Sequence, residues 1–308
     1  EDIVYPLTIK VGYSTGETDP RGVALAQFKE DVEEGTDHNV LIEIHPEGEL
    51  GSDGELIAGL ISGDVDVTVS SAGNYALYAT RLGVSALPFL FEDFESAWKF
   101  IDSDEIQAVG GDLEEYNMHI LAYFDNGFRC VTTTEKVGPV LDAKDMDGLN
   151  IRTPDNQIVM ETMSELGATP RSYPFAELVD ALKDGTFDAQ ENPIPVIYNS
   201  KLYEVQKYLS VTNHSYDTMP LTIRSDLWMG ISDEYKTVIE DAAQKAQDYN
   251  RSLVKKQSED CVEKLKEEGM IVNYPDLTPF RKATAGVSKV FEDVFGEDLL
   301  NYVKEATK

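Results

Sequence analysis

Cysteine and histidine are scarce in this chain of 308 residues, which contains two cysteines and four histidines. Cys130 and Cys261 lie far apart, without the short spacing of a metal site, and no two histidines form an HxxxH pattern. The sequence therefore gives no support for a structural or catalytic metal centre. Its cysteine content is compatible both with one disulfide in an oxidising compartment and with two buried free thiols.

Basic residues are also few, because 26 lysines and arginines stand against 57 acidic residues, for a formal net charge of −31. A surface this negative repels nucleic acid and anionic lipid, so we expect neither as a partner. The same charge repels a carboxylate ligand that diffuses toward the protein. The simplest interpretation is a heavily solvated surface suited to salty surroundings.

Long apolar runs are missing as well. The longest is VSALPFLF at 84–91, which is too short to cross a bilayer, so we expect a soluble chain with no membrane insertion. The chain begins at Glu1 rather than at methionine, which predicts an exported mature form whose signal peptide has been removed. A chain of this length should form two lobes or domains.

Predicted strands and helices alternate along the whole chain. This order favours an α/β fold with parallel βαβ crossovers and a doubly wound sheet. A stretch from Ser232 to about Glu268 has no proline or glycine, and as a helix it would be about 55 Å long and lie across both lobes. The predicted strands are 7–13, 39–44, 65–71, two strands within 118–134 that break at Asp125-Asn126-Gly127, 148–153 and 187–190; the predicted helices are 19–34, 54–64, 93–116, 155–167 and 175–185.

The stretch GYSTG at 12–16 matches G-x-S-x-G, the nucleophile elbow of α/β-hydrolases. The elbow needs a helix that starts at the serine, whereas residues 17–20 intervene here. A polar loop between strand and helix is the better interpretation, and such loops at the carboxyl ends of strands are where α/β proteins bind ligands. The alternative, a hydrolase with Ser14 as nucleophile and His119 or His214 as base, remains open at this point.

Arg152 is the most informative cation in the sequence. It stands in GLNIRTPDN, with apolar residues on one side and a proline turn on the other. An arginine that points into an interior keeps its charge and must meet an anion there. Its planar pairing geometry suits a ligand carboxylate. Further cations and amides that could assist are Arg129, Arg171 and Asn192.

From about residue 7 to residue 300 the chain resembles the periplasmic solute-binding subunits of tripartite ATP-independent periplasmic (TRAP) transporters. Several segments carry the resemblance, in this order: IKVGYSTGETDPRG, HPEGELGSDGELIAGLISGDVDVTVSS, ALPFLF, GLNIRTPDN, ELGATPRSYPFAELVDALKDG, FDAQENPIP and the long helix from Ser232. Binding proteins of ATP-driven transporters share the two-lobe architecture but not the Arg152 and Glu191-Asn192-Pro193 segments.

The resemblance implies the fold and the partners. It implies a periplasmic binding protein with two α/β lobes, a hinged central cleft and a long helix that spans both lobes. Lobe I would comprise 1–124 and 212–250, and lobe II 125–211 and 251–308. The cleft would close on a small organic carboxylate, such as a sugar acid, and deliver it to the small and large membrane subunits. Uptake would use an ion gradient, so we expect no cofactor and no enzymatic activity, and we expect a monomer.

The resemblance also implies the ligand-binding residues. Arg152 would pair with the ligand carboxylate, assisted by Arg129 and Asn192, and Phe175 would pack on the ligand. Arg171, where smaller or hydroxyl residues are commoner, would add a cation to the cleft or pair with an acid such as Asp155. The polar residues at 71 and 74 argue against sialic acid as the substrate. Specificity contacts are expected from Ser14, Ser71, Asn74, Asp155 and His214.

Overall fold

The computed structural model describes residues 3–306, and a single mixed sheet of nine strands runs through them. The strand order is β2-β1-β3-β8-β4-β7-β5-β6, and β9 pairs with β8. The strands are β1 (Leu7–Gly12), β2 (Val40–His45), β3 (Val67–Val69), β4 (Met118–Thr133), β5 (Asn150–Thr153), β6 (Thr169–Ser172), β7 (Ala189–Pro193), β8 (Tyr208–Arg224) and β9 (Ile271–Asn273).

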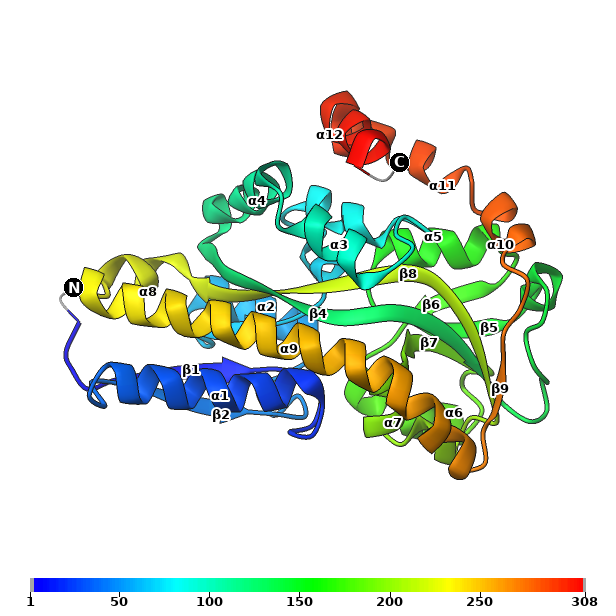
Figure 1. Cartoon of the computed structure of the whole chain (residues 1–308), viewed down its shortest axis with the longest axis horizontal. Coiled ribbons are helices and arrows are strands. Elements are labelled where there is room, and N and C mark those ends of the chain that lie inside the picture. The colour runs from blue at the N-terminus through cyan, green and yellow to red at the C-terminus, as the bar shows by residue number, and fades with distance from the viewer. Residues whose placement is uncertain (1–2, 307–308) are drawn as a thin grey trace.

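The two ends of the sheet have the predicted parallel arrangement, and its centre does not. β1 is parallel to β2 and β3, and β5 is parallel to β6 and β7. Between these halves β4 and β8 form a long antiparallel pair, and each also pairs antiparallel with the neighbouring half. The expectation of βαβ units was therefore correct for each half. The long strands β4 and β8 join the halves into one sheet (Figure 1).

The prediction of two strands within 118–134 was wrong, because β4 is one strand of 16 residues. The Asp125-Asn126-Gly127 segment is a register shift within the β4–β8 ladder rather than a turn. Gly127 has φ of 108°, a conformation that favours glycine, so the turn signal in the sequence is real. It marks an irregularity where the strand passes from one half of the sheet to the other.

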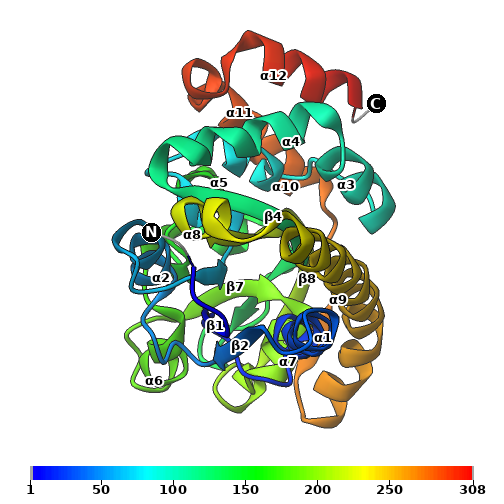
Figure 2. The ribbon, with the colours of Figure 1, turned by 90° about the vertical axis from the view of Figure 1, so that its left-hand side faces the viewer.

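Helices cover both sides of this sheet. Figures 1 and 2 show α3, α4, α5 and α12 on one side of the β4–β8 pair, with α1 and α7 on the other. The helices are α1 (Pro20–Gly35), α2 (Asp53–Ser62), α3 (Phe94–Ile101), α4 (Asp104–Gly110), α5 (Gln157–Glu165), α6 (Leu178–Lys183), α7 (Ile194–Asn199), α8 (Ser225–Gly230), α9 (Asp233–Glu267), α10 (Thr278–Ala283), α11 (Val287–Val290) and α12 (Glu292–Ala306). No helix in the described part of the chain is long and apolar enough to span a membrane.

The long helix predicted from Ser232 is confirmed. α9 has 35 residues, begins after the Ser232 cap, and packs on α1, β4 and α7 (Figure 1). It is tied to the irregular part of β4, because Asn250 Oδ1 accepts a hydrogen bond from the Asp125 amide at 2.6 Å. Gln247 Oε1 accepts one from the Tyr123 amide at 2.8 Å. The helix α9 and the strand β4 therefore run next to each other where the chain passes from one half of the sheet to the other.

The C-terminal helices pack with the first half of the chain. Val287, Phe295 and Leu299 belong to the same buried cluster as Leu56, Phe100 and other residues of α2 to α4. The division into 1–124 with 212–250 and 125–211 with 251–308 stays a prediction. These contacts favour grouping α12 with lobe I, whereas α11 also packs on α5, which the predicted division places in lobe II.

The two cysteines are free and buried within one hydrophobic cluster. The Cys130 thiol lies 3.2 Å from Asn213 Oδ1, to which it donates a hydrogen bond. Of the two alternatives left open by the sequence, the structure shows buried free thiols. Burial raises the pKa of the Cys130 thiol to about 12, so this thiol is unreactive at neutral pH.

Candidate ligand-binding site

Two adjoining cavities lie where the halves of the sheet meet, and together they are called the cleft below. One has a volume of about 30 Å³ and the other about 230 Å³. The walls come from both halves of the sheet, as a closing binding site requires. The residues that line both cavities are Asp53, Asn74, Arg152, Pro154 and Phe175, and the smaller cavity is also lined by Ser14, Thr15, Arg21, Ser71, Asn126, Arg129, Asn192 and Val196.

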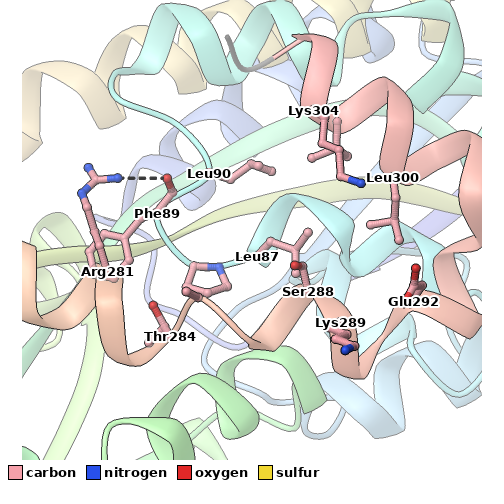
Figure 3. Close-up of a pocket in the computed structure, with 13 residues that line it drawn as sticks. Leu87, Phe89, Leu90, Arg281, Thr284, Ser288, Lys289, Glu292, Leu300 and Lys304 are labelled. Atoms are coloured by element: carbon pink, nitrogen blue, oxygen red, sulfur yellow. Dashed lines mark hydrogen bonds between the residues drawn. The ribbon is translucent and has the colours of Figure 1, made fainter.

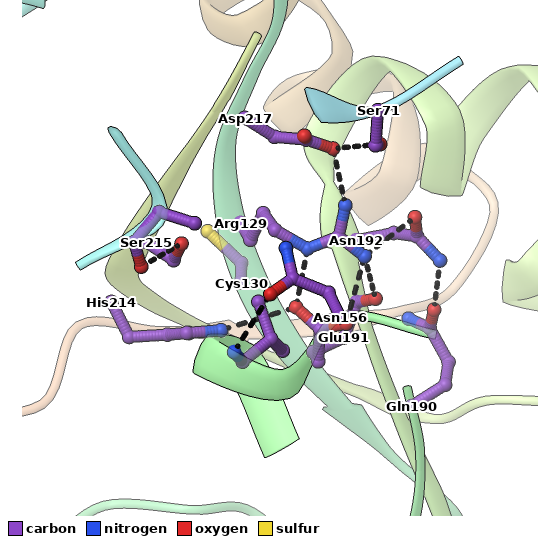
Figure 4. Close-up of polar contacts among 12 residues, drawn as sticks. Ser71, Arg129, Cys130, Asn156, Gln190, Glu191, Asn192, His214, Ser215 and Asp217 are labelled. Carbon is purple, nitrogen blue, oxygen red and sulfur yellow. Dashed lines mark hydrogen bonds and ion pairs between the residues drawn. The ribbon is translucent and has the colours of Figure 1, made fainter. Parts of the chain in front are cut away.

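Arg129 lies in a network of protein carboxylates (Figure 4). Its Nη2 donates to Glu191 Oε1 at 2.7 Å, and its Nη1 donates to Asp217 Oδ2 at 2.7 Å. Burial opposes its charge, but Glu191 and Asp217 outweigh burial and raise the pKa of Arg129. The pKa of Glu191 is lowered, because Arg129 and His214 outweigh the effect of burial on that carboxyl. The charge of Arg129 is thus compensated from within the protein.

His214 lies behind this network, fully buried and apart from the side chains that line the cleft. Its Nε2 is 3.2 Å from Glu191 Oε2, and its Nδ1 is 2.8 Å from Thr212 Oγ1. The contact with the Glu191 carboxylate requires a proton on Nε2, so His214 donates to Glu191. His214 therefore positions Glu191, and its predicted direct contact with a ligand stays a prediction.

Arg152 has the opposite surroundings, although it is also buried, with 3% of its surface exposed. Its Nε and Nη2 donate to the Tyr173 carbonyl oxygen at 2.9 and 2.6 Å. No carboxylate of residues 3–306 lies within ion-pair distance of it. Burial, followed by the repulsion of Arg129, lowers the pKa of Arg152 to about 10. Arg152 thus remains cationic at neutral pH and lines the cleft without an anionic partner from the described chain.

Neutral acceptors and donors surround these cations. Ser71 Oγ and Asn126 Nδ2 both donate to Asp217 Oδ2, at 2.7 and 2.8 Å. Asn192 accepts from Arg129 Nη2 at 3.2 Å and donates to Gln190 Oε1 at 2.6 Å. Asn74 Oδ1 is buried and has no hydrogen-bond partner among the described residues. It is an acceptor available to a ligand hydroxyl.

Ser14 lines the cleft but lacks the surroundings of a nucleophile. Its Oγ donates to Asp53 Oδ1 at 3.2 Å and accepts from Arg21 Nη1 at 3.4 Å. The helix begins at Pro20, not at the serine. Both candidate bases are engaged elsewhere, since His119 contacts Glu114 Oε1 at 2.5 Å and His214 contacts Glu191. A hydrolase elbow is therefore not formed, and the hydrolase alternative fails on geometry.

The remaining predicted residues lie at different distances from the centre. Phe175 lines both cavities, with its ring centroid 5.8 Å from Arg152 Cζ. Asp155 is exposed at the wall of the larger cavity. Arg171 is exposed on β6, donates to the Thr186 carbonyl at 2.9 Å and stacks over the Phe187 ring. It is not among the residues that line the cleft, so its contact with a ligand stays a prediction.

Sequence reasoning missed several residues of the cleft and its supporting network. Arg21 follows the Asp19-Pro20 helix cap and is buried, with its Nη1 donating to the Val69 carbonyl at 3.0 Å. The sequence of β8 could have indicated its role in the network. A central strand that reads VTNHSYDT carries too many polar residues for an apolar core. The other missed residues are Asp53, Asn126, Glu191 and Asp217.

Comparison with known proteins agrees with this geometry. The model of the family "Bacterial extracellular solute-binding protein, family 7" matches residues 11–293. This chain belongs to that family. The 2,3-diketo-L-gulonate-binding periplasmic protein YiaO of Escherichia coli is 32% identical to it over 305 residues, which cover 97% of this chain and 92% of the relative.

Solved structures of family members superimpose on nearly the whole chain. A TRAP periplasmic solute-binding protein from Polaromonas sp. JS666, bound to D-erythronate, has 34% identity and a TM-score of 0.93, and covers 96% of this chain and 98% of its own. The sugar acid binding protein DctPAm from Advenella mimigardefordensis, in complex with galactonate, has 30% identity and a TM-score of 0.95, and covers 99% of both chains. The predicted family and two-lobe fold are confirmed.

Proposed function

We propose that this protein is a TRAP substrate receptor whose cleft binds a polyhydroxylated monocarboxylate, with Arg152 pairing with the carboxylate. One observation carries the proposal: Arg152 is a buried cation of the cleft that no protein carboxylate neutralises. Its free N–H groups can form the planar pair that arginine makes with carboxylates. A ligand carboxylate would supply the missing negative charge.

The charges in the cleft favour one carboxylate on the ligand rather than two. Arg129 already pairs with Glu191 and Asp217, so it offers no unpaired charge to a second carboxylate. Asp53 lines both cavities and would repel one. Asp53 and the free Asn74 Oδ1 are instead acceptors for hydroxyl groups. The erythronate and galactonate complexes of related proteins support a sugar acid as the ligand class.

The size of the cavities favours a cleft that opens and closes. The smaller cavity, of about 30 Å³, is far below the range of about 300–1,000 Å³ that is typical of small-molecule sites, so a sugar acid needs both cavities or a wider cleft. We propose hinges near residues 125 and 212 and along α9 around Asn250. The register shifts of the β4–β8 ladder lie near the first two positions. Strand irregularities of this kind can absorb a change in dihedral angles between lobes.

The location and partners follow from the family. Related proteins are named periplasmic, and we propose that this protein also works outside the cytoplasmic membrane, after removal of an export signal. It would hand its ligand to the small and large TRAP membrane subunits, whose transport uses an ion gradient. In this scheme the receptor captures and delivers its ligand without any chemical step.

A thermal-shift screen tests the proposal. The ligands are D-galactonate, D-erythronate, succinate, N-acetylneuraminate and neutral D-galactose, each with wild-type protein and Arg152→Ala. A ligand present at about 100 times its Kd stabilises the folded state by about 2.7 kcal/mol. We expect such a shift with D-galactonate or D-erythronate and not with succinate, N-acetylneuraminate or galactose, and we expect it only in the wild type. A shift with succinate or galactose alone, or an equal shift in Arg152→Ala, would contradict the proposal.

A further inference from the structure

A third cavity lies away from the cleft and is larger than either of its parts. It has a volume of about 640 Å³ and shares no lining residue with the cleft. Segment 87–90 forms one wall, and α10, α11 and α12 form the other (Figure 3). We call it the C-terminal groove. Its volume falls in the range of about 300–1,000 Å³ that is typical of small-molecule sites.

The groove has an apolar floor. Leu87 and Leu300 are buried beneath it, and Leu90 and Phe89 are half-buried at its wall. In Figure 3 Leu87, Leu90 and Leu300 lie together in the middle of the groove. An apolar chain that settles there would lose contact with water along its length, which favours binding.

The charged residues of the groove are mainly cations. Arg281, Lys289 and Lys304 line it, against one acid, Glu292. The whole chain has the reverse balance, with 26 basic and 57 acidic residues. Lys289 and Lys304 are exposed, and neither has an ion-pair partner within residues 3–306. Their ammonium groups are therefore available to an anion at the edge of an apolar surface.

Phe89, in the wall of the groove, has an unusual backbone conformation. Its φ is 54°, a value that a bulky residue adopts only under strain. Two hydrogen bonds fix it: its amide donates to the His214 carbonyl at 3.0 Å, and its carbonyl accepts from Arg281 Nη1 at 3.3 Å. The guanidinium of Arg281 also lies 4.9 Å from the centroid of the Phe89 ring. Strained backbone conformations are frequent at ligand-binding positions. Here the strained residue, Phe89, lines the groove.

We propose that the C-terminal groove is a second binding site, for an amphiphilic organic anion with an unbranched aliphatic body and one carboxylate. The leucine floor accommodates the body, and Lys289 and Lys304 receive the carboxylate. This ligand differs from the polyhydroxylated acid of the cleft. The groove has leucines in its lining beside Thr284 and Ser288, whereas the cleft has no leucine in its smaller cavity and is lined there mainly by charged, hydroxyl and amide side chains. The two sites are thus distinguishable by ligand chemistry.

Calorimetric titration of the full chain with decanoate tests this site. We expect one saturable site, an affinity up to about fifteenfold lower for octanoate because two methylene groups are lost, and much weaker binding of uncharged 1-decanol. The double variant Lys289→Glu/Lys304→Glu should bind decanoate about fivefold to tenfold more weakly, since two surface attractions become repulsions. Lys282→Glu is the matched control, because Lys282 is an exposed residue of α10 outside the groove lining, and it should bind normally.

Two further variants complete the test. Arg152→Ala should bind decanoate as the wild type does, because the cleft is a separate site. Leu90→Ser, checked for an unchanged unfolding temperature, should weaken decanoate binding by removing part of the apolar wall. Loss of decanoate binding in Arg152→Ala would place decanoate in the cleft and overturn the proposal. Equal binding by wild type and the lysine double variant, or no saturable binding at all, would also overturn it.

Discussion

The surroundings of Arg129 and Arg152 differ, although both are buried arginines that line the same cleft. Arg129 pairs with Glu191 and Asp217 and has its pKa raised. Arg152 donates to a backbone carbonyl, lies over the Phe175 ring without a carboxylate partner among the described residues, and has its pKa lowered. The same residue type therefore has two roles. An arginine that the protein neutralises builds the wall of the site, and one that the protein leaves unneutralised is available to bind a foreign anion.

The largest expected effect is on stability, from Arg129→Ala. Removal of this cation leaves Glu191 and Asp217 buried without their partner, which should cost about 3–5 kcal/mol of unfolding free energy. Urea unfolding measures it. Arg171→Ala is the control, because Arg171 is exposed and its loss should change stability by less than about 0.5 kcal/mol. An equal, small effect of both variants would show that the Arg129 network is not a structural element.

The next effect is on binding, from Arg152→Ala. We expect a loss of about 2–5 kcal/mol in ligand affinity, because the ligand carboxylate would enter a buried site without its partner. Arg152→Lys should not restore it, since lysine lacks the planar fork. Calorimetry with the best ligand of the screen measures both. Near-native affinity in Arg152→Lys would contradict the pairing, and a comparable loss in Arg171→Ala would show that Arg171 also contacts the ligand.

A buried acid extends the comparison. Burial raises the pKa of Asp125 to about 7, although Trp98 Nε1 donates to it at 2.9 Å and Arg251 also favours its charged form. Between pH 3.8 and about 7, Asp125 is therefore protonated in the folded state and mostly deprotonated in the unfolded state, where its pKa is near 3.8. The stability that Asp125 contributes is present below pH 3.8 and is lost as the pH rises through about 7.

Asp125→Asn removes this titration. The stability of the variant relative to the wild type should therefore increase as the pH rises from about 4 to about 7, and then level off. Urea unfolding of both proteins across this range measures the difference. If the stability difference between the variant and the wild type does not change with pH in this range, Asp125 is charged throughout it. In that case Asp125 would be compensated by a cation, as Glu191 is by Arg129.

The smallest effect concerns the rate of binding. The net charge of −31 should repel an anionic ligand at long range, whereas the cations of the cleft act at short range. Salt shortens the Debye length from about 30 Å at 0.01 M to about 8 Å at 0.15 M, so added salt should increase the association rate and leave dissociation nearly unchanged. Stopped-flow fluorescence of Trp98 or Trp228 follows the reaction. A steep decrease with salt would show that the field of the arginines dominates instead.

The sequence predicted the elements that depend on local pattern. The α9 helix and the strands β1, β2 and β5 follow from periodicity and caps, whereas the short edge strand β6 was not predicted. It did not predict that β4 continues through Asp125-Asn126-Gly127, because a bulge and a turn have the same local signal. Only pairing with β8, which is distant in sequence, decides between them.

The same limit applies to the site. The apolar neighbours of Arg152 and the proline turn after it mark it as a buried cation. That Arg129 is neutralised and Arg152 is not depends on Glu191 and Asp217, which come from β7 and β8. Arg21 and Asp53 reach the cleft from the first turns of α1 and α2, where the sequence shows ordinary helix starts. Contacts between distant segments therefore define the site.

The most direct test of the account is a thermodynamic cycle between Arg152 and the ligand carboxylate. Calorimetry compares the best sugar acid with its primary amide, in wild-type protein and in Arg152→Ala. If the unneutralised Arg152 pairs with the ligand, the acid should bind the wild type more tightly than the amide by about 2 kcal/mol or more, and this preference should vanish in the variant. An equal preference for the acid in both proteins would show that another group receives the carboxylate, and the assignment of Arg152 would be wrong.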